Sequence, residues 1–186
     1  MTERRLLVAC ALILLPIVSF GQAKRPMSIN DLITAVRVSD PQVAPDGKRV
    51  LFVRTTTALE SGKRNSDIWS VPVDGSSAPA ALITGDKTEN SPRFSPDGKR
   101  ILFISTRAGD PQVFAANPDG SNVKQVTKLS GGVQPPIMIS PDSKKIAVVV
   151  DVFPDCKDDD CNKQMREKEE KDPVKAHVIT GLPYRH

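Results

Sequence analysis

The residues that could carry acyl-transfer chemistry are the serines and two histidines. A hydrolase serine of the α/β type stands in a Gly-x-Ser-x-Gly elbow between a strand and a helix, and this pattern occurs nowhere in the 186 residues. His177 and His186 lie in a strand-like segment with no such serine nearby in the chain. We therefore expect both histidines to pack in strands or loops, and we assign no catalytic residue to this chain.

Metal chemistry is weakly supported. Asp155 and the run at residues 158–160 form an acidic cluster that could attract calcium, but the alternate spacing and the glycine of an EF-hand loop are missing. A zinc site would need more ligands than Cys156 and Cys161, which have no second cysteine pair beside them. The sequence thus predicts no metal and no cofactor, and calcium at the acidic cluster stays open.

Cys156 and Cys161 are better suited to a disulfide. The four residues between them let two Cα atoms approach the roughly 5.5 Å that a disulfide needs. The third cysteine, Cys10, lies in a segment that we expect to be removed, which leaves an even pair. We expect this pair to be joined in an oxidising compartment.

The N-terminus is typical of a secretory signal peptide. Arg4 and Arg5 precede an uncharged apolar run at residues 6–20, which is short, contains proline and ends in small residues. We predict a signal peptide over residues 1–23, cleaved after Ala23 or Gly21. The protein is then periplasmic or extracellular, with no membrane segment left after cleavage.

The net charge argues against nucleic acid as a partner. The formal charge of +4 falls to about +3 when residues 1–23 are removed. The remaining lysines and arginines are scattered in pairs, mostly just after turns, whereas a nucleic-acid surface concentrates them with aromatic residues. The sequence therefore indicates a solvated rim and no nucleic-acid partner.

One phrase occurs three times and organises the chain. Residues 91–104 read S-P-R-F-S-P-D-G-K-R-I-L-F-I, and residues 40–53 and 135–148 are altered copies. In each copy, proline and aspartate precede glycine or serine in a tight turn that leads into a strand. The turn aspartates Asp46, Asp97 and Asp142 are 51 and 45 residues apart, near the roughly 40–50 residues of a four-stranded propeller blade. The repeat predicts a β-propeller.

The strand after the second turn has apolar residues on both sides. Residues 100–104 do not alternate with polar residues, so this strand should lie in a sheet stacked between two others. Asp-Gly pairs at residues 74–75 and 119–120 predict further hairpins. In the second blade we expect strands near residues 92–95, 100–106, 112–117 and 122–127.

Other segments fit around these blades. Ser28 and Asp31 predict a capped short helix that packs on its own domain, and polar residues 55–66 predict a loop. Trp69 is expected to pack within a blade, with a ligand-stacking role as the alternative. Ser143 replaces the glycine of the other two turns, so the third turn should be looser, because a left-handed serine costs about 1 kcal/mol.

The predicted fold is all-β: an incomplete propeller of about two and a half four-stranded blades. We expect a signal peptide at 1–23, a lead-in with a short helix at 24–40 and a partial propeller at 41–186. The blades would span about 41–84, 91–127 and 136–186, with a charged insertion at 152–175, either a solvated helix or mobile, interrupting the third. With so few blades, we expect strand faces such as residues 101–104 to be partly uncovered, and the chain to self-associate.

Several of these segments resemble one family of enzymes. Four segments are similar to the N-terminal part of secreted serine peptidases of the prolyl oligopeptidase family, close to acylaminoacyl-peptidases and dipeptidyl peptidases. They are the lead-in M-S-I-N-D-L at residues 27–32, the turn at 39–49, the D-I-W strand at 67–69 and the tail D-P-V-K-A-H-V-I-T-G-L-P-Y-R-H at 172–186. The Pro-Asp-Gly repeat alone is shared with Tol-system propellers. In the peptidases, a propeller of about seven blades covers a hydrolase domain that carries the Ser-Asp-His triad.

The resemblance implies a role in proteolysis without catalysis by this chain. Peptide substrates would be gated by the propeller and hydrolysed by an α/β-hydrolase domain that the sequence does not contain. The alternative is a non-catalytic periplasmic protein-binding propeller of the Tol-system type. A gene remnant without function is the third reading.

Overall fold

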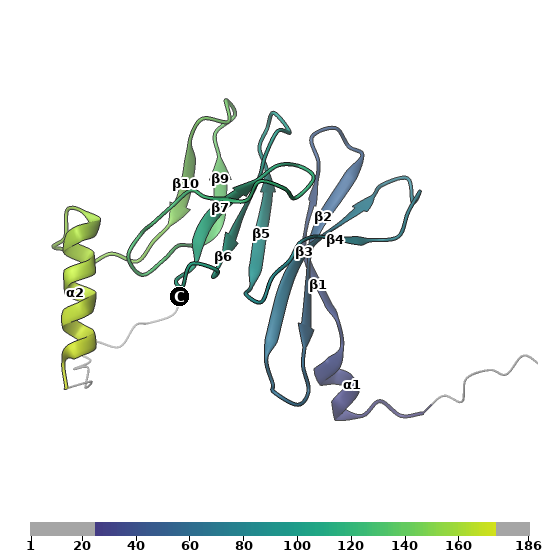
Figure 1. Ribbon diagram of the computed structural model, residues 1–186, viewed down its shortest axis with the longest axis horizontal. Helices are drawn as coiled ribbons and strands as arrows, with labels where there is room; N and C mark the ends of the chain where they lie inside the picture. The colour runs from purple at the N-terminus through teal and green to yellow at the C-terminus, as the bar shows by residue number, and fades with distance from the viewer. Residues whose placement is uncertain (1–24, 174–186) are drawn as a thin grey trace, which may run out of the picture.

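The structure is a computed structural model that describes residues 25–173, so the predicted signal peptide, His177 and His186 lie outside the described residues. Three antiparallel sheets stand side by side in a row, with a short helix before them and a longer helix after them (Figure 1). We call the sheets blades 1, 2 and 3. Among the described residues, no helix is long and apolar enough to cross a membrane.

Each sheet is formed from one uninterrupted stretch of chain. Blades 1 and 2 each pair four strands in sequence order, and blade 3 pairs two. Blade 1 contains β1 (Arg37–Val43), β2 (Arg49–Thr57), β3 (Arg64–Pro72) and β4 (Ala80–Ile83). Blade 2 contains β5 (Glu89–Phe94), β6 (Ile101–Ser105), β7 (Gln112–Ala116) and β8 (Lys124–Gln125), and blade 3 contains β9 (Gln134–Ile139) and β10 (Ile146–Val149). The all-β, incomplete-propeller prediction is confirmed, and the strands of blade 2 lie where they were expected.

The repeated Pro-Asp-Gly phrase forms the same turn in all three blades. The amide of Gly98 donates to the carbonyl of Ser95 at 2.8 Å, and Ser143 donates to Ser140 at the same distance. Ser143 adopts a left-handed conformation, with φ of 57°, against 69° for Gly98. The expectation of a looser third turn is therefore wrong, because the serine accepts the left-handed backbone. Its hydroxyl also accepts a hydrogen bond from the Asp97 amide of the neighbouring turn, at 3.3 Å.

The first core lies between blades 1 and 2. Leu51 and Ile68 of blade 1 are fully buried against Ile101 and Phe103 of blade 2. Phe103 stacks on Phe114 with ring centroids 5.9 Å apart. Fully burying such a side chain contributes about 1.5–3 kcal/mol, so this interface holds the two blades together.

The second core lies on the other side of blade 2. Leu102, Ile104 and Val113 pack with Val133 and Ile137 of the third repeat. Because β6 is buried on both faces, the expectation that residues 101–104 are partly uncovered is wrong. Successive residues of one strand point to opposite faces, so the apolar run supplies both interfaces. Within residues 25–173, the more exposed apolar side chains of the sheets lie on the end blades, such as Val38 on blade 1 and Met138 on blade 3.

The segment at residues 55–66 is a hairpin whose strands continue well beyond the predicted limits. Thr55 pairs with Ser66 and Thr57 with Arg64, so only the tip at residues 58–63 is a loop. The hydroxyls of Thr55 and Ser66 lie 2.8 Å apart and bond across the pair. The loop prediction was too wide, because threonines suit a strand even where no apolar residue alternates with them.

The lead-in helix has the predicted cap. Helix α1 (Ile29–Thr34) begins after Ser28, whose hydroxyl accepts a bond from the Asp31 amide, while the Asp31 carboxylate accepts one from the Ser28 amide. No residue of α1 is buried, and Leu32 is 58% exposed. The helix therefore forms as predicted but does not bury its apolar face, in contrast to our expectation.

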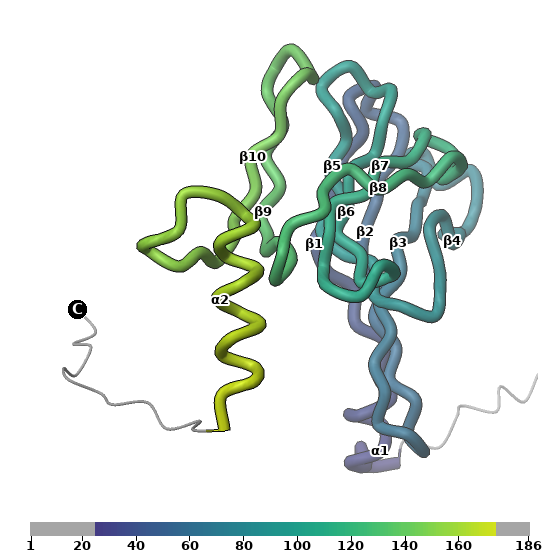
Figure 2. Tube along the Cα trace, turned by 60° about the vertical axis from the view of Figure 1, so that its left-hand side comes forward, coloured from purple at the N-terminus to yellow at the C-terminus, as the bar shows by residue number. Residues whose placement is uncertain are grey.

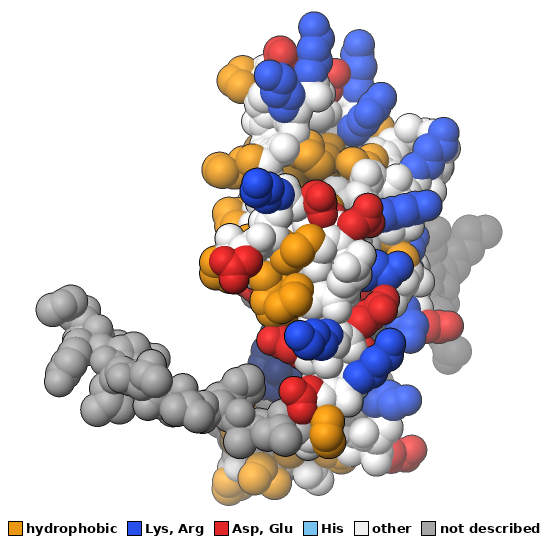
Figure 3. All heavy atoms as spheres, turned by 90° about the vertical axis from the view of Figure 1, so that its left-hand side faces the viewer, with side chains coloured by type: hydrophobic (Ala, Val, Ile, Leu, Met, Phe, Trp, Pro, Cys, Tyr) orange, Lys and Arg blue, Asp and Glu red, His pale blue; other side chains and the backbone are white. Residues whose placement is uncertain are grey.

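The charged run after blade 3 folds as a helix. Helix α2 (Asp159–Lys171) starts at the N-cap Asp158, whose carboxylate accepts a bond from the Cys161 amide at 2.9 Å. Charged side chains of both signs cover the side of the molecule where α2 lies (Figure 3). The helix stands beside the blades and meets them near its first turns (Figure 2). Of the two predicted forms of this insertion, the structure has the solvated helix.

Candidate functional site: a cleft between blade 2 and helix α2

The acidic cluster of the sequence does not form a cation site in the described residues. Asp158 is used as the cap of α2, Asp159 turns toward Ser130, and Asp160 is exposed on the first helical turn. Within residues 25–173, no group of three or more His, Cys, Asp or Glu side chains is arranged to hold a metal ion. The carboxylates diverge because neighbouring positions on a helix are separated by about 100°.

The two cysteines lie at the entry to α2. Their sulfur atoms are bonded at 2.03 Å and their Cα atoms are 5.4 Å apart. The Cys156 amide donates to the carbonyl of Phe153 in the turn that precedes the helix. The bond therefore closes the short loop that delivers Asp158 and Asp159 to the start of the helix.

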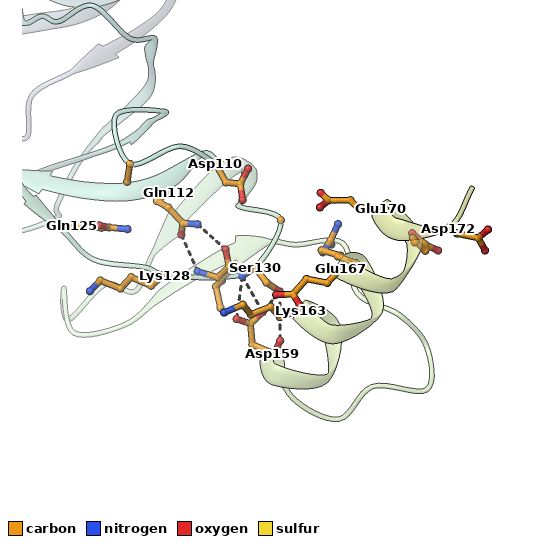
Figure 4. A pocket seen from close by; sticks show the side chains of 15 residues that line it. Asp110, Gln112, Gln125, Lys128, Ser130, Asp159, Lys163, Glu167, Glu170 and Asp172 are labelled. Carbon is orange, nitrogen blue, oxygen red and sulfur yellow. Dashed lines mark hydrogen bonds between the residues drawn. The ribbon is translucent and has the colours of Figure 1, made fainter. Parts of the chain in front are cut away.

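A wide cleft lies between the end of blade 2 and one side of α2 (Figure 4). Its volume is about 1200 Å³. One wall comes from the loops around β7 and β8, and the other comes from successive turns of α2. A cleft of this size, open to solvent on one side, can take several residues of an extended peptide.

Ser130 and Asp159 close the base of the cleft. The Ser130 amide donates to both carboxylate oxygens of Asp159, at 3.1 and 3.0 Å, and its hydroxyl donates to Oδ1 at 2.8 Å (Figure 4). Bonds to a charged acceptor are stronger than neutral ones. This contact ties the first turn of α2 to the link between blades 2 and 3.

Arg166 holds the next turn of the helix over the same link. Its guanidinium donates to the carbonyl of Asp151 and lies 5.8 Å from the ring centre of Phe153. A Cβ atom on Gly131 would lie 2.3 Å from the Arg166 guanidinium carbon, and Gly131 has φ of 75°. Glycine suits this position because of the left-handed backbone, and a larger residue would also require the Arg166 guanidinium to shift.

The blade wall of the cleft is held rigid by Gln112. This side chain is only 5% exposed and uses both ends of its amide: Nε2 donates to the carbonyl of Leu129 at 2.7 Å, and Oε1 accepts from the Thr127 hydroxyl at 2.7 Å and from the Leu129 amide at 3.1 Å. A buried amide satisfied in this way fixes the segment that carries Lys128 and Ser130.

Negative charge predominates along the cleft. Six carboxylates face three cations among the lining residues. The carboxylates are Asp110, Asp159, Glu167, Glu169, Glu170 and Asp172, and the cations are Lys128, Lys163 and Arg166. Glu169, Glu170 and Asp172 each have a partner of their own. The balance favours a ligand with positive charge over an anion.

An ion pair with a fully buried carboxylate lies at the same end of blade 2. Glu89 is fully buried, and its Oε1 accepts bonds from the Ser105 hydroxyl at 3.0 Å and from Arg107 at 2.9 Å. The Arg107 guanidinium also lies 5.5 Å and 5.3 Å from the ring centres of Phe103 and Phe114. This group closes the end of the blade core, and the sequence analysis did not identify it.

The serines of the repeated turns have structural partners. Ser95 Oγ donates to Asp97 at 2.6 Å, and this bond, followed by one from the Lys99 amide, holds the pKa of Asp97 below its ordinary value. Ser140 does the same for Asp142, whose pKa is also lowered. Residues 25–173 contain no histidine, so none of their serines has an imidazole beside it within the described part of the chain. Within residues 25–173, these serines therefore serve as hydrogen-bond partners inside the turns.

Comparison with known proteins gives a family and two relatives that are named as peptidases. Residues 17–157 match the family PD40, described as the TolB beta propeller domain. The chain is 34% identical over 164 residues to the "Uncharacterized peptidase YuxL" of Bacillus subtilis (strain 168), covering 87% of this chain and 24% of the relative. It is 30% identical over 160 residues to "Dipeptidyl-peptidase 5" of Porphyromonas endodontalis, covering 86% of this chain and 22% of the relative.

The chain therefore spans about a quarter of the length of these two relatives. Among solved structures, the uncomplexed acylaminoacyl peptidase of Pyrococcus horikoshii is similar with a TM-score of 0.48 and 28% identity, over 62% of this chain and 17% of that one.

Proposed function

Because this chain belongs to the family of TolB β-propeller domains, we propose that it is the propeller part of an exported serine peptidase and that it controls which peptides reach a hydrolase domain. The observation that supports the proposal is the alignment with proteins named as peptidases over more than four fifths of the chain. The missing Gly-x-Ser-x-Gly elbow agrees with a role in admission of substrate and not in bond cleavage.

The cleft between blade 2 and α2 is the part of the chain that we propose meets the substrate. Its excess of carboxylates suits the cationic amino groups of peptides. The contacts of Asp159 and Arg166 set its width, because they join α2 to the link between the blades. Loosening these contacts should change which peptides pass, and should leave the chemical step unaltered.

The coding sequence downstream of the codon for His186 gives the first test. A Gly-x-Ser-x-Gly elbow with further blades in the same reading frame is the expected result. A stop codon with no hydrolase sequence beyond it would overturn the peptidase proposal and leave the binding propeller.

The second test uses the full-length enzyme. Asp159→Asn should change the ratio of kcat/KM for long and short peptides, because the substitution weakens the hydrogen bonds from Ser130 to residue 159. Asp160→Asn is the matched control, since Asp160 is exposed on the same helical turn. Equal ratios for the two variants would contradict the role of the cleft.

The chain alone should hydrolyse nothing. Acyl transfer needs an activated nucleophile, a base within hydrogen-bond reach and donors aimed at the oxyanion. We expect no turnover of chromogenic aminoacyl peptides by the purified chain and no labelling by a fluorophosphonate probe. Labelling of any serine in a preparation free of host peptidases would show that a nucleophile exists.

Export is part of the same proposal. The predicted signal peptide should be absent from material recovered outside the cytoplasm, and an intact mass beginning at Gln22 or Lys24 is expected. A product that retains residues 1–20 would contradict it.

A non-catalytic binding propeller is the second candidate, and the family description itself, which names TolB, favours it. In that case the blade faces and the cleft would bind another protein, and the coding sequence after His186 would encode no hydrolase domain.

A further inference from the structure

We propose that the Cys156–Cys161 disulfide is a redox-sensitive control of the cleft between blade 2 and α2, and that its reduction by a dithiol loosens the helix wall of this cleft. The inference rests on the proposed function, because it assigns a means of regulation to the same site. It uses only contacts between residues 129 and 166, which do not depend on the surfaces that a longer chain would cover.

The disulfide closes the loop that carries the two carboxylates at the start of α2. Cys156 lies in the turn before the helix and Cys161 lies in its first turn, so Asp158 and Asp159 are held between them. The Asp158 carboxylate caps the helix by accepting a bond from the Cys161 amide at 2.9 Å. The Asp159 carboxylate accepts the bonds from the amide and hydroxyl of Ser130 (Figure 4). The bond therefore fixes the residues that attach α2 to the link between blades 2 and 3.

A small cavity connects the disulfide with this attachment. Its volume is about 230 Å³, and Cys156, Ser130, Asp159 and Asn162 are among the residues that line it. Both cysteines are half-buried. A small dithiol can therefore approach Cys156 from a cavity that also borders the Ser130–Asp159 contact.

The charge of the loop favours opening once the bond is broken. Residues 155–160 contain four carboxylates and one lysine. Asp155 and Asp160 directly precede the two cysteines, whose Cα atoms are 5.4 Å apart, and both aspartates are exposed. Like charges held at short range repel each other, most strongly at low ionic strength. Reduction removes the covalent bond that opposes this repulsion.

Asn162 keeps the helix in place after reduction. Its side chain is only 5% exposed, accepts a bond from the Phe153 amide at 2.8 Å and donates to the Asp158 carbonyl at 2.9 Å. These bonds cross the same turn as the disulfide without involving sulfur. Arg166, further along α2, donates separately to the Asp151 carbonyl. Reduction should therefore loosen the first turn without releasing the helix, so the change is reversible.

The reaction is thiol–disulfide exchange. A thiolate of the dithiol attacks Sγ of Cys156, the bond to Cys161 breaks, and Cys161 leaves as a thiolate that takes up a proton. The second thiol of the reductant then attacks the mixed disulfide, which frees Cys156 and leaves the reductant as a disulfide. Two electrons and two protons pass from the dithiol to the cysteine pair.

Amide exchange in the full-length enzyme measures the loosening directly. The Ser130 amide donates to Asp159, so its exchange rate reports this contact. Reduction with dithiothreitol should raise the rate by about threefold to thirtyfold, the range that a short disulfide loop can contribute. The amides of β6 are the control and should exchange as before. The proposal is overturned if the Ser130 rate stays the same with both thiols free, if β6 loses protection as well, or if the bond resists excess dithiothreitol in the folded enzyme.

A variant without the bond assigns the effect to this cysteine pair. Cys156→Ser combined with Cys161→Ser should exchange at Ser130 like the reduced enzyme and should not respond to dithiothreitol. A response of the same size in this double variant would assign the effect to another disulfide and contradict the proposal.

Peptide selection gives the functional measurement. Reduction should shift the ratio of kcat/KM for long and short peptides in the same direction as Asp159→Asn does, and Asp160→Asn should still respond to reduction. If Asp159→Asn shifts the ratio and reduction does not, the redox inference is wrong and the proposed function stands. If neither shifts it, the cleft does not select peptides and both proposals are wrong.

Discussion

Arg93 bridges to Asp40 across two blades and 53 positions of sequence, and Nη1 of the arginine donates to both carboxylate oxygens at 3.0 and 2.9 Å. The two residues come from β5 and β1, the first strands of their blades. Each side chain is about a quarter exposed, at 25% and 27%. The pair supplements the apolar core between blades 1 and 2 with one directional contact.

Removing this pair should reveal a small coupling energy. We expect Asp40→Asn and Arg93→Gln to interact by about 0.5–1 kcal/mol in a double-mutant cycle, as partly exposed ion pairs do. Asparagine is chosen because Asp40 has φ of 50°, which asparagine tolerates. Urea unfolding measures the four proteins. Asp40→Asn with Lys99→Gln is the control cycle and should be additive, and additivity in both cycles would argue that the pair contributes nothing.

Two glycines at equivalent turn positions should differ in cost. Gly75 and Gly120 both have positive φ, 69° and 83°, but a Cβ on Gly75 meets nothing within 4 Å, whereas one on Gly120 lies 2.4 Å from the Leu82 carbonyl oxygen. Gly75→Ala should cost about 1–2 kcal/mol from backbone strain. Gly120→Ala should cost about 1–3 kcal/mol more, because the backbone of blade 1 must move. Equal urea unfolding midpoints for Gly75→Ala and Gly120→Ala would show that the backbone of blade 1 moves away from residue 120 at no cost in stability.

The repeated turns should lose stability in acid. The pKa values of Asp97 and Asp142 are lowered by bonds from Ser95 and Ser140, followed by backbone amides. A lowered folded pKa means that the unfolded chain binds the proton first, so the contribution is complete above the ordinary pKa of 3.8 and is lost as pH falls through the lower folded value. Asp97→Asn should flatten the acid limb of a stability profile. An unchanged slope below pH of about 4 would contradict this account.

The Cys156–Cys161 bond should stabilise the segment that leads into α2, and it should add little to the free energy of unfolding of the whole protein. A loop this short gives a chain-entropy gain of about 2 kcal/mol or less. Replacing both cysteines with serine should raise amide exchange in residues 153–171 and leave β6 and β7 unchanged. Alkylation without reduction tests the bond itself in material made in an oxidising compartment, where both thiols should stay unmodified. Two labelled thiols would refute the prediction.

The parts of the fold that the sequence predicted are those set by local chemistry. The turn at Asp97 is specified by the proline before it and the glycine after it, and the strand at Ile101 by an apolar run too continuous for a surface strand. The ends of β2 and β3 were missed because threonine, serine and asparagine give no apolar alternation, so a hairpin and a polar loop look alike in sequence.

Most contacts of the candidate site could not be predicted from the sequence. The contact of Ser130 with Asp159 joins residues 29 positions apart, one of them in an acidic run that any solvated helix could contain. Glu89 is a single charge at the start of a strand, and burial of a lone carboxylate depends on an arginine that arrives 18 positions later. The paired glycines at residues 131–132 were the available signal, since both adopt positive φ where α2 and Pro111 approach.

The order of the strands has a consequence for how the protein forms. Within residues 25–173 every sheet pairs strands that are neighbours in sequence, so no strand of this part of the chain has to wait for a distant partner, and the entropy of closing long loops is avoided within a blade. Blade 1 can therefore assemble its ladder while the chain that makes blade 2 is still being synthesised. The apolar face that blade 1 turns toward blade 2 stays exposed to solvent until blade 2 has been synthesised. The time between the synthesis of successive blades is therefore when the nascent chain is most prone to aggregate and to bind chaperones.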